Sequence, residues 1–273
     1  MRRLLALFFL LMTSAVLMAG VEPFPGADAR AIGLGYAYTA VQGQWGCVFF
    51  NPAGIAGGTR PEMGVYAERR FGLRELTYAA AGGIYPLGAQ QAIGLELRSF
   101  GFDAFRQSQI GLAYAITLLD RLTLGVKGKY SSLSIPGYGG AGVLLADVGL
   151  SLRLTDELQL GVSAYNVNRG AMQTALGGVE VAPTVLLAGM AYRPTEELLL
   201  VAEVSKEETS PANFRGGLEY QVGKLISVRV GAGSEPLLLS GGLGLSWEGL
   251  RIDVAYSYTE IFSSPHFGLS YEF

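Results

Sequence analysis

The only histidine of the chain, His266, stands close in sequence to Ser263 and Ser264. A hydrolase uses serine and histidine as nucleophile and general base, but only where the two side chains are held within hydrogen-bonding distance. Proximity along the chain does not establish that geometry. His266 begins a predicted strand, so we expect it at the rim of a sheet without a chemical role. The sequence predicts no catalytic residue and gives no reason to expect an enzyme.

Two further patterns that could bind a cofactor or a metal fail on their context. Residues 137–142 read GYGGAG and fit G-x-G-x-x-G letter for letter, but a dinucleotide site needs a helix after the glycines, and a predicted strand follows here. One histidine, one cysteine and no clustered carboxylates supply no metal site. Cys47 has no cation nearby to activate a thiolate, so we expect a buried apolar side chain. No cofactor is predicted.

The composition is poor in charge and rich in glycine. Of 273 residues, 50% are hydrophobic, only 16% are charged and 39 are glycine, whereas a soluble domain carries about 25% charged residues. Residues 1–20 combine Arg2 and Arg3 with an apolar stretch that ends on a small residue, which is typical of a signal peptide and so of export; a membrane anchor is the alternative. Without the two arginines the net charge changes from −3 to −5, which gives no reason to expect nucleic acid as a partner.

From residue 62 onward, apolar residues alternate with small or polar ones in successive short segments. In residues 122–130, LTLGVKGKY, Leu122 and Leu124 share one face while Lys127 and Lys129 share the other. This period of two predicts β-strands. Fourteen segments follow the pattern, with twelve or sixteen as the alternatives; they span 62–70, 75–86, 90–100, 106–118, 122–133, 142–154, 158–167, 183–193, 197–206, 212–222, 225–233, 236–247, 250–259 and 265–273.

The connections between these segments alternate in length. Tight turns such as 119–121 and 248–249 follow the even segments, whereas longer or glycine- and proline-rich links such as 134–140, 168–183 and 260–265 follow most odd ones. Short turns on one rim and longer loops on the other are typical of outer-membrane barrels. The short-turn rim is then periplasmic and holds both ends of the barrel.

The predicted fold is therefore all-β, a transmembrane antiparallel up-and-down barrel, against a soluble two-sheet sandwich as the alternative. A closed barrel satisfies every backbone hydrogen-bonding group inside lipid. Outward aromatic residues near strand ends suit the interface girdles of such barrels; they are Tyr130, Tyr192, Trp247, Tyr258 and Tyr271.

The last predicted strand must pair with the first to close the barrel. Its outward apolar residues resemble the signal by which outer-membrane barrels are passed to their insertion machinery; they are Phe267, Leu269, Tyr271 and Phe273. Outer-membrane lipid and that machinery are the partners expected from this pattern.

Residues 26–56, GADARAIGLGYAYTAVQGQWGCVFFNPAGIA, break the strand pattern. This segment resembles the N-terminal region of the FadL superfamily of outer-membrane barrels, and most closely that of the PorV/PorQ-type proteins. The match falls on Ala29-Arg30-Ala31, Gly33, Gly35, Ala37, Thr39-Ala40-Val41, Phe50 and Asn51-Pro52-Ala53-Gly54. Gln42-Gly43-Gln44-Trp45 replace the acidic pair usual in the family, and the chain lacks the long extracellular loops of its larger members.

The resemblance implies that residues 21–60 lie as a hatch inside the barrel formed by residues 61–273. Its hatch motif comprises Gly33, Gly35, Thr39, Asn51, Pro52, Ala53 and Gly54. The number of strands also calls for such a segment. Side chains fill the interior of an eight-stranded barrel, whereas a barrel of fourteen strands needs a plug or encloses a lumen.

The polar face of the strands predicts which side chains line that lumen. The charged side chains carry mixed signs, which favours internal ion pairs that hold a hatch; a lumen with hydrated charges or a charge-selective pore is the less favoured alternative. They are Glu68, Glu96, Arg98, Lys127, Lys129, Asp147, Arg153, Glu203, Arg215, Glu219, Arg229, Arg251 and Asp253. Apolar residues that fall on the same inward face are Leu145, Val185, Leu187, Leu199, Val201 and Leu238.

Three functions follow as expectations. The FadL resemblance implies binding or passage of apolar small molecules, and the inward apolar residues favour it. The PorV/PorQ resemblance implies an accessory barrel in protein secretion or surface assembly, with a secretion-system protein as partner. A structural barrel without a specific ligand is the third. Passage sideways into the bilayer needs a break in the wall, for which Gly101 is the candidate.

Overall fold

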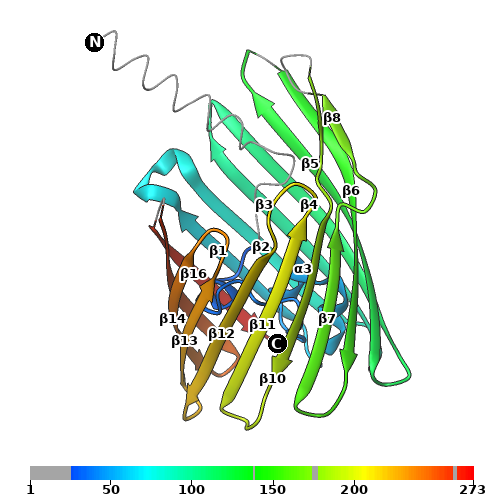
Figure 1. Cartoon of the computed structure of the whole chain (residues 1–273), viewed down its shortest axis with the longest axis vertical. Helices are drawn as coiled ribbons and strands as arrows, with labels where there is room; N and C mark the ends of the chain where they lie inside the picture. The colour runs from blue at the N-terminus through cyan, green and yellow to red at the C-terminus, as the bar shows by residue number, and fades with distance from the viewer. Residues whose placement is uncertain (1–25, 138, 174–177, 261–262) are drawn as a thin grey trace.

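Fourteen strands of the chain close into one antiparallel barrel, and this confirms the predicted fold class (Figure 1). The computed structural model describes residues 26–137, 139–173, 178–260 and 263–273; the predicted signal peptide, residues 1–20, lies outside them. The barrel strands are β1 (Glu62–Arg69), β2 (Thr77–Pro86), β3 (Gln91–Phe102), β4 (Phe105–Leu118), β5 (Leu122–Ile135), β6 (Gly139–Arg153), β7 (Leu158–Tyr165), β10 (Val185–Tyr192), β11 (Leu198–Glu207), β12 (Asn213–Val222), β13 (Ile226–Gly233), β14 (Leu238–Trp247), β15 (Leu250–Thr259) and β16 (Ser263–Glu272).

The described helices are all short. They are α2 (Ala29–Gly33), α3 (Cys47–Phe50), η1 (Pro52–Gly57), η2 (Arg70–Gly72) and η3 (Arg74–Leu76). Across the described ranges, no helix combines the length and the apolar character that crossing a membrane requires.

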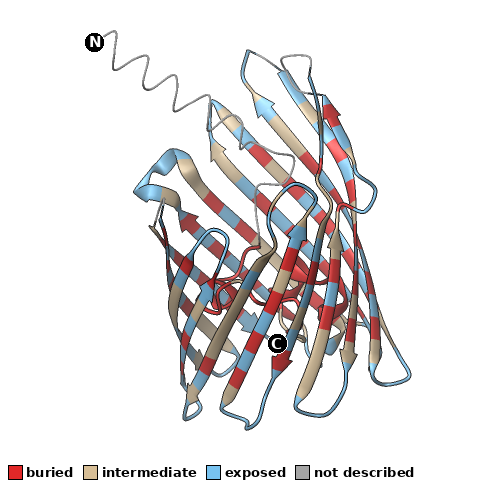
Figure 2. Ribbon diagram, viewed as in Figure 1, coloured by how far each residue is buried: buried red, intermediate tan, exposed pale blue. Residues whose placement is uncertain are grey.

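The last strand closes the barrel by pairing with the first. In the β1–β16 ladder Glu62 faces Glu272, and Phe273 N donates to Pro61 O at 3.0 Å. Side chains alternate between the two faces of the wall, as the bands of buried and exposed residues along the strands show (Figure 2). Large apolar side chains on the outward face are exposed; Leu112 and Leu144, for example, are 67% and 70% exposed. An apolar exterior around a polar interior fits a bilayer rather than water.

The predicted girdle aromatics and the four residues of the predicted insertion signal all lie on the outward face. Phe267, Leu269, Tyr271 and Phe273 are 48%, 36%, 42% and 56% exposed.

The two rims differ as predicted, but the difference rests on fewer loops than expected. Turns such as 119–121 and 248–249 connect strands at the short-turn rim, at the bottom of Figure 1. At the opposite rim, called the far rim here, the expected loop 134–140 is mostly strand, because β5 and β6 continue to Ile135 and from Gly139. The expected link 260–265 is likewise shortened by β16.

The long link after β7 contains structure of its own. Residues 168–183, expected as a loop, include the two-stranded sheet of β8 (Ala171–Gln173) and β9 (Val179–Val181). Met172 packs with Ala182 against inward-facing Val143 and Leu145 of β6. This excursion therefore covers part of β6 above the point where its ladder with β7 ends, at Val148.

The wall has no break at Gly101, so that expectation was wrong. Gly101 faces Arg106 in the β3–β4 ladder, and β2 pairs with β3 up to Phe100. The positive φ of 100° lets the strand bend there without leaving the ladder.

Residues 26–59, called the inner segment here, lie within the barrel (Figure 1). They include α2, α3 and η1, and most of their side chains are buried, among them Ile32, Tyr38 and Phe49. Asp28 begins α2 by accepting a hydrogen bond from Arg30 N, and Asn51 begins η1 in the same way from Ala53 N. The segment packs with the wall into one core.

Inward-facing glycines make room for the inner segment around almost the whole wall. A Cβ atom on any of them meets the segment at or below van der Waals distance: on Gly217 it would lie 2.5 Å from Leu34 O, and on Gly161 it would lie 2.7 Å from Ala40 Cα. This glycine ring comprises Gly64, Gly82, Gly94, Gly125, Gly149, Gly161, Gly217, Gly231, Gly242 and Gly268. Close approach of the inner segment to the wall thereby accounts for ten of the 39 glycines.

Gly161→Ala tests this packing. The added methyl group has to displace the backbone at Ala40, so we expect about 1–3 kcal/mol of destabilisation. Gly128→Ala is the matched control, because an added Cβ on outward-facing Gly128 contacts nothing. Thermal unfolding of both variants in detergent measures the effect. Equal midpoints for the two variants would show that the inner segment is not packed on the wall as described.

Candidate functional site

A buried ion cluster ties the inner segment to the wall on the side of the short-turn rim. Arg30 of α2 donates to Glu219 of β12 through Nε and Nη2, at 2.7 and 2.6 Å. Arg229 of β13 bonds the same carboxylate at 2.5 Å and also bonds Asp253 of β15 at 2.6 Å. All four side chains are at most 7% exposed. Each charge is therefore paired, as burial demands.

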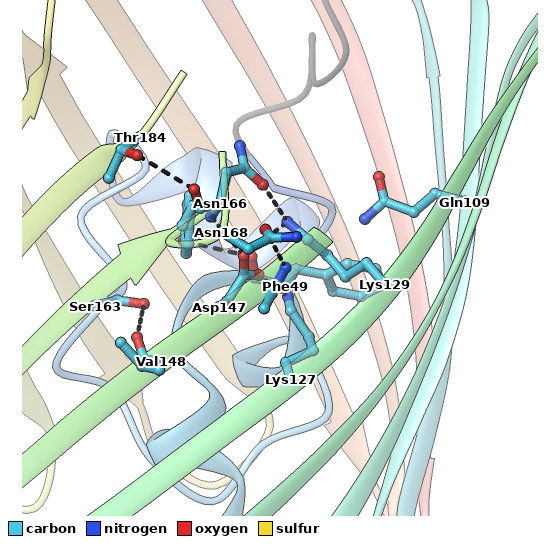
Figure 3. Close-up of polar contacts among 12 residues, drawn as sticks. Phe49, Gln109, Lys127, Lys129, Asp147, Val148, Ser163, Asn166, Asn168 and Thr184 are labelled. Carbon is cyan, nitrogen blue, oxygen red and sulfur yellow. Dashed lines mark hydrogen bonds and ion pairs between the residues drawn. The ribbon is translucent and has the colours of Figure 1, made fainter. Parts of the chain in front are cut away.

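A second cluster lies on the far-rim side, over α3 (Figure 3). Lys127 bonds Glu96 at 3.0 Å and Asp147 at 3.2 Å, and Lys129 bonds Asp147 at 2.9 Å. In Figure 3 both lysines point toward that aspartate. Arg98 bonds Glu96 at 3.1 Å.

The second cluster also holds α3. Lys127 Nζ donates to Val48 O at 2.9 Å, and the Arg98 guanidinium lies 5.0 Å from the centroid of the Phe49 ring. Two wall residues extend the cluster: Asn166 N donates to Asp147 at 3.0 Å, and Gln109 donates to Glu96 at 2.8 Å.

Carboxylates of the wall also accept hydrogen bonds from the backbone of the inner segment. Glu203 Oε2 accepts from Tyr38 N and Thr39 N at 3.1 and 3.0 Å. Glu62 accepts from Trp45 N at 2.9 Å. Backbone groups that lack partners in this irregular segment are thus satisfied from the wall.

The residues predicted as the hatch motif lie at the contact with the wall. Asn51 Nδ2 donates to Thr39 O at 2.8 Å and to Leu150 O of β6 at 3.2 Å. Gly33 and Gly35 lie against β13, β14 and the strand ends beside them, and Gly35 has a φ of 67°. Pro52, Ala53 and Gly54 form the first turn of η1, against the glycines of β5 and β6.

Among the remaining predicted lumen charges, Glu68 bonds Arg70 at 3.0 Å, whereas the others face inward but are held more loosely. Arg215 lies 3.5 Å from Glu203, and Arg251 donates to Gln44 at 3.0 Å. Arg153 forms no ion pair within the described residues. It lines a cavity of about 660 Å³ at the short-turn rim, between the inner segment and the β2–β3 and β4–β5 turns.

His266 was misplaced by sequence reasoning, which put it on the rim. It is 3% exposed and faces the lumen, with Nε2 at 2.8 Å from Ser257 Oγ and Nδ1 at 2.7 Å from the Tyr66 hydroxyl. These partners come from β15 and β1, which flank β16, so only the closure of the barrel brings them together. Tyr66 and Ser257 were not predicted, because a single tyrosine or serine on a strand gives no signal.

Burial changes the pKa of titratable groups in the inner segment, Asp28 and Cys47 among them. Burial, to which the Asp253 carboxylate adds, raises the pKa of Asp28 to about 7. Burial raises the pKa of the Cys47 thiol to about 12, so this cysteine is a packed apolar residue at neutral pH. Over the described part of the chain, no group of three or more His, Cys, Asp or Glu side chains could hold a metal ion.

Arg30→Met tests the ion cluster. The change leaves the buried Glu219 with one cation in place of two, so we expect about 3 kcal/mol of destabilisation. Arg60→Met is the control, because the Arg60–Glu272 pair is 65% and 50% exposed and should matter little. Because Cys47 is fully buried, its reaction with a maleimide reports release of the inner segment. We expect this reaction to be faster in R30M than in the wild type, and unchanged in R60M. Equal labelling of both variants contradicts the assignment.

Asp28→Asn tests the seat of α2 through pH. The pKa of Asp28 is higher in the folded protein than its ordinary 3.8, so protonation stabilises the fold, and this contribution is lost as the pH rises through about 7. Asparagine keeps the cap without titrating. Between pH 5 and pH 8 we expect the free energy of unfolding of the wild type to fall by about 2 kcal/mol more than that of D28N. Thermal midpoints across this range measure the difference, and parallel curves would refute it.

Comparison with known proteins finds likeness in structure only. No protein-family model matches the chain, and no curated protein matches its sequence. Solved structures do match: a FadL homologue of Pseudomonas aeruginosa has a TM-score of 0.66 at 12% identity, over 92% of this chain and 98% of that one. The toluene transporter TodX of Pseudomonas putida has a TM-score of 0.65 at 12% identity, over 92% of this chain and 98% of that one. The monoaromatic hydrocarbon channel CymD has a TM-score of 0.65 at 12% identity, over 91% of this chain and 98% of that one. The chain therefore has the barrel fold of FadL-type hydrocarbon channels.

Proposed function

We propose that this protein is an outer-membrane barrel that passes small hydrophobic molecules, with residues 21–60 acting as a hatch within the barrel of residues 61–273. One observation carries the proposal. The lumen is filled by a segment that meets a wall of bare glycine backbone and is fixed by a limited set of buried ion pairs and hydrogen bonds. Such a segment can shift once those ties are exchanged, because at the glycines of the ring no wall side chain stands in its way.

Apolar surface inside the barrel supports a hydrophobic cargo. Inward-facing Leu145, Leu187, Leu199, Val201 and Leu238 are all buried. Tyr66 and Tyr78 meet at a centroid distance of 5.6 Å on the β1–β2 wall. The two solved barrels named as hydrocarbon channels, TodX and CymD, share this fold.

The polar cavity at the short-turn rim suits the exit of this route. It borders the inner segment at Gln42 and residues 56–59, so displacement of the segment opens the lumen toward it. The β3–β4 ladder, which continues through Gly101, argues for passage past the hatch rather than through a break at that position.

Location in the outer membrane accompanies this function. The apolar exterior, the aromatic strand ends and the outward residues Phe267, Leu269, Tyr271 and Phe273 support insertion there by the barrel-insertion machinery. The signal peptide over residues 1–20 supplies the export route.

A role as a PorV/PorQ-type accessory barrel in secretion is the alternative. Its support is the motif match in residues 26–56. A structural barrel without a specific ligand is the third reading, and the transport assay below separates all three.

A cross-linked hatch tests the proposal. Ala29 of α2 and Gly268 of β16 can be joined by a disulfide after a small shift of α2, because a Cβ on Gly268 lies 3.2 Å from Ala29 Cβ, just under the roughly 3.5–4.5 Å of a disulfide. In a Cys47→Ala background, A29C/G268C should stop toluene uptake when oxidised and restore it when reduced. The readout is radiolabelled toluene entering porin-deficient cells with an intact lipopolysaccharide layer.

Met63→Cys with Tyr271→Cys is the control. These residues are directly opposite on the outward face of β1 and β16, so their disulfide ties wall to wall and leaves the hatch free. Uptake that continues through the oxidised A29C/G268C protein would rule out the hatch as gate. If wild-type protein adds no uptake over cells without it, transport is wrong. Co-purification of a stoichiometric protein partner would then favour the secretion role, and its absence the structural one.

A further inference from the structure

A chain of uncharged hydrogen-bonding groups lies on the lumen wall at β1, β15 and β16, where the first and last strands of the barrel meet. Ser257 Oγ, the two ring nitrogens of His266 and the Tyr66 hydroxyl are linked at 2.8 and 2.7 Å. The Tyr66 hydroxyl also lies 3.4 Å from Glu68, which is bonded to Arg70 at 3.0 Å. The one carboxylate beside this chain is therefore already neutralised by its own cation.

Two further hydroxyl groups extend the chain sideways. Ser240 of β14 and Ser264 of β16 are the direct cross-strand partners of Ser257, so three inward serines form a row. The Oγ atoms of Ser240 and Ser264 are buried and have no hydrogen-bond partner among the described residues. Ser264 is 0% exposed. A buried hydroxyl without a partner is unfavourable unless something else supplies the bond.

The polarity of the chain can reverse. When Ser257 donates to His266 Nε2, its oxygen keeps a lone pair that can accept from a ligand; when Nε2–H donates to Ser257, the serine hydrogen can donate. Ser264 supplies a second hydroxyl next to it. A group that both donates and accepts at one oxygen, an alcohol or a phenol, satisfies this pair in either state.

Aromatic surface adjoins the hydroxyl groups. The His266 ring stacks on Tyr66 at 6.0 Å, Tyr66 meets Tyr78 edge-on, and Phe100 follows on β3 as the cross-strand partner of Tyr78. Aromatic faces of this kind pack well against a ring.

We propose that Ser257, Ser264, His266 and Tyr66 form a neutral subsite that binds the hydroxyl group of an otherwise apolar ligand, such as an alkylphenol. The subsite rests on the proposed transport function and narrows its cargo to apolar molecules with one uncharged hydroxyl. A carboxylate is disfavoured, because Glu68 lies beside the site and the cation next to it, Arg70, already bonds that carboxylate at 3.0 Å.

The subsite is closed in this conformation. Ser257 is 2% exposed, and Tyr36 of the inner segment packs against the core cluster that contains Tyr66 and Tyr78. Tyr36 has a φ of 65°, a conformation uncommon for a bulky residue, next to Gly35 at 67°. Binding of the ligand is thus coupled to movement of the inner segment at this position.

Competition between isosteric probes tests the subsite. Using the toluene uptake of the wild-type protein, we measure the concentration of 4-methylphenol or of 1,4-dimethylbenzene that halves it. The two probes differ by a hydroxyl in place of a methyl group. We expect 4-methylphenol to compete at a concentration roughly tenfold lower in the wild type, and the advantage to disappear in S257A/S264A. Ser131→Ala, a buried inward serine on β5 away from the site, should keep the advantage.

The outcomes separate the subsite from the transport function. Toluene uptake with equal competition by both probes overturns the subsite and leaves transport standing, as does an advantage that survives in S257A/S264A. If the protein carries no toluene, transport fails, and saturation-transfer NMR on the purified protein then compares the same two probes. Equal signals there overturn the subsite, and a 4-methylphenol signal lost only in S257A/S264A supports it.

Discussion

The close approach of the inner segment to the bare backbone of the wall is the contact on which the rest of the structure depends. Each inward glycine of the ring gives up side-chain volume in the lumen, and the inner segment fills it with its own backbone and side chains. The two parts share one core, in which Ile32, Phe49 and Phe50 of the segment belong to the same buried cluster as Tyr66 and Tyr78 of the wall. The inner segment and the inward side chains of the wall thus fill the middle of a wide barrel together.

Buried charge sets the position of the segment within this packing. Glycine contacts are smooth and carry little directional preference, whereas the pairs of Arg30 with Glu219 and of Lys127 with Val48 O join fixed points on two different sides of the lumen. Low-dielectric surroundings make each unpaired charge costly, so a displaced segment must find other partners for several groups at once. The buried charges therefore fix the position of the inner segment, even though the wall that it contacts is largely glycine backbone.

Local periodicity carried most of what could be predicted. The alternation forced by lipid outside and polar groups inside marks all fourteen strands, and the tight turn at residues 223–224 sets the register of β12 and β13, so the Glu219–Arg229 ion pair follows from the sequence pattern. Far-rim strand ends were missed, since glycine-rich residues 134–140 read as a loop. His266 was misplaced because its partners come from strands at opposite ends of the chain, and no local pattern records that neighbourhood.

The order in which the chain is made has a consequence for how the inner segment is seated. Its residues precede every strand in the sequence, yet Ala29 rests on Gly268 of the last strand, and Trp45 on Gly64 of the first. The seat is complete only when the two ends of the sheet meet. The segment therefore cannot make all of its contacts with the wall before the C-terminal strand has paired with the first, although it comes before every strand in the sequence.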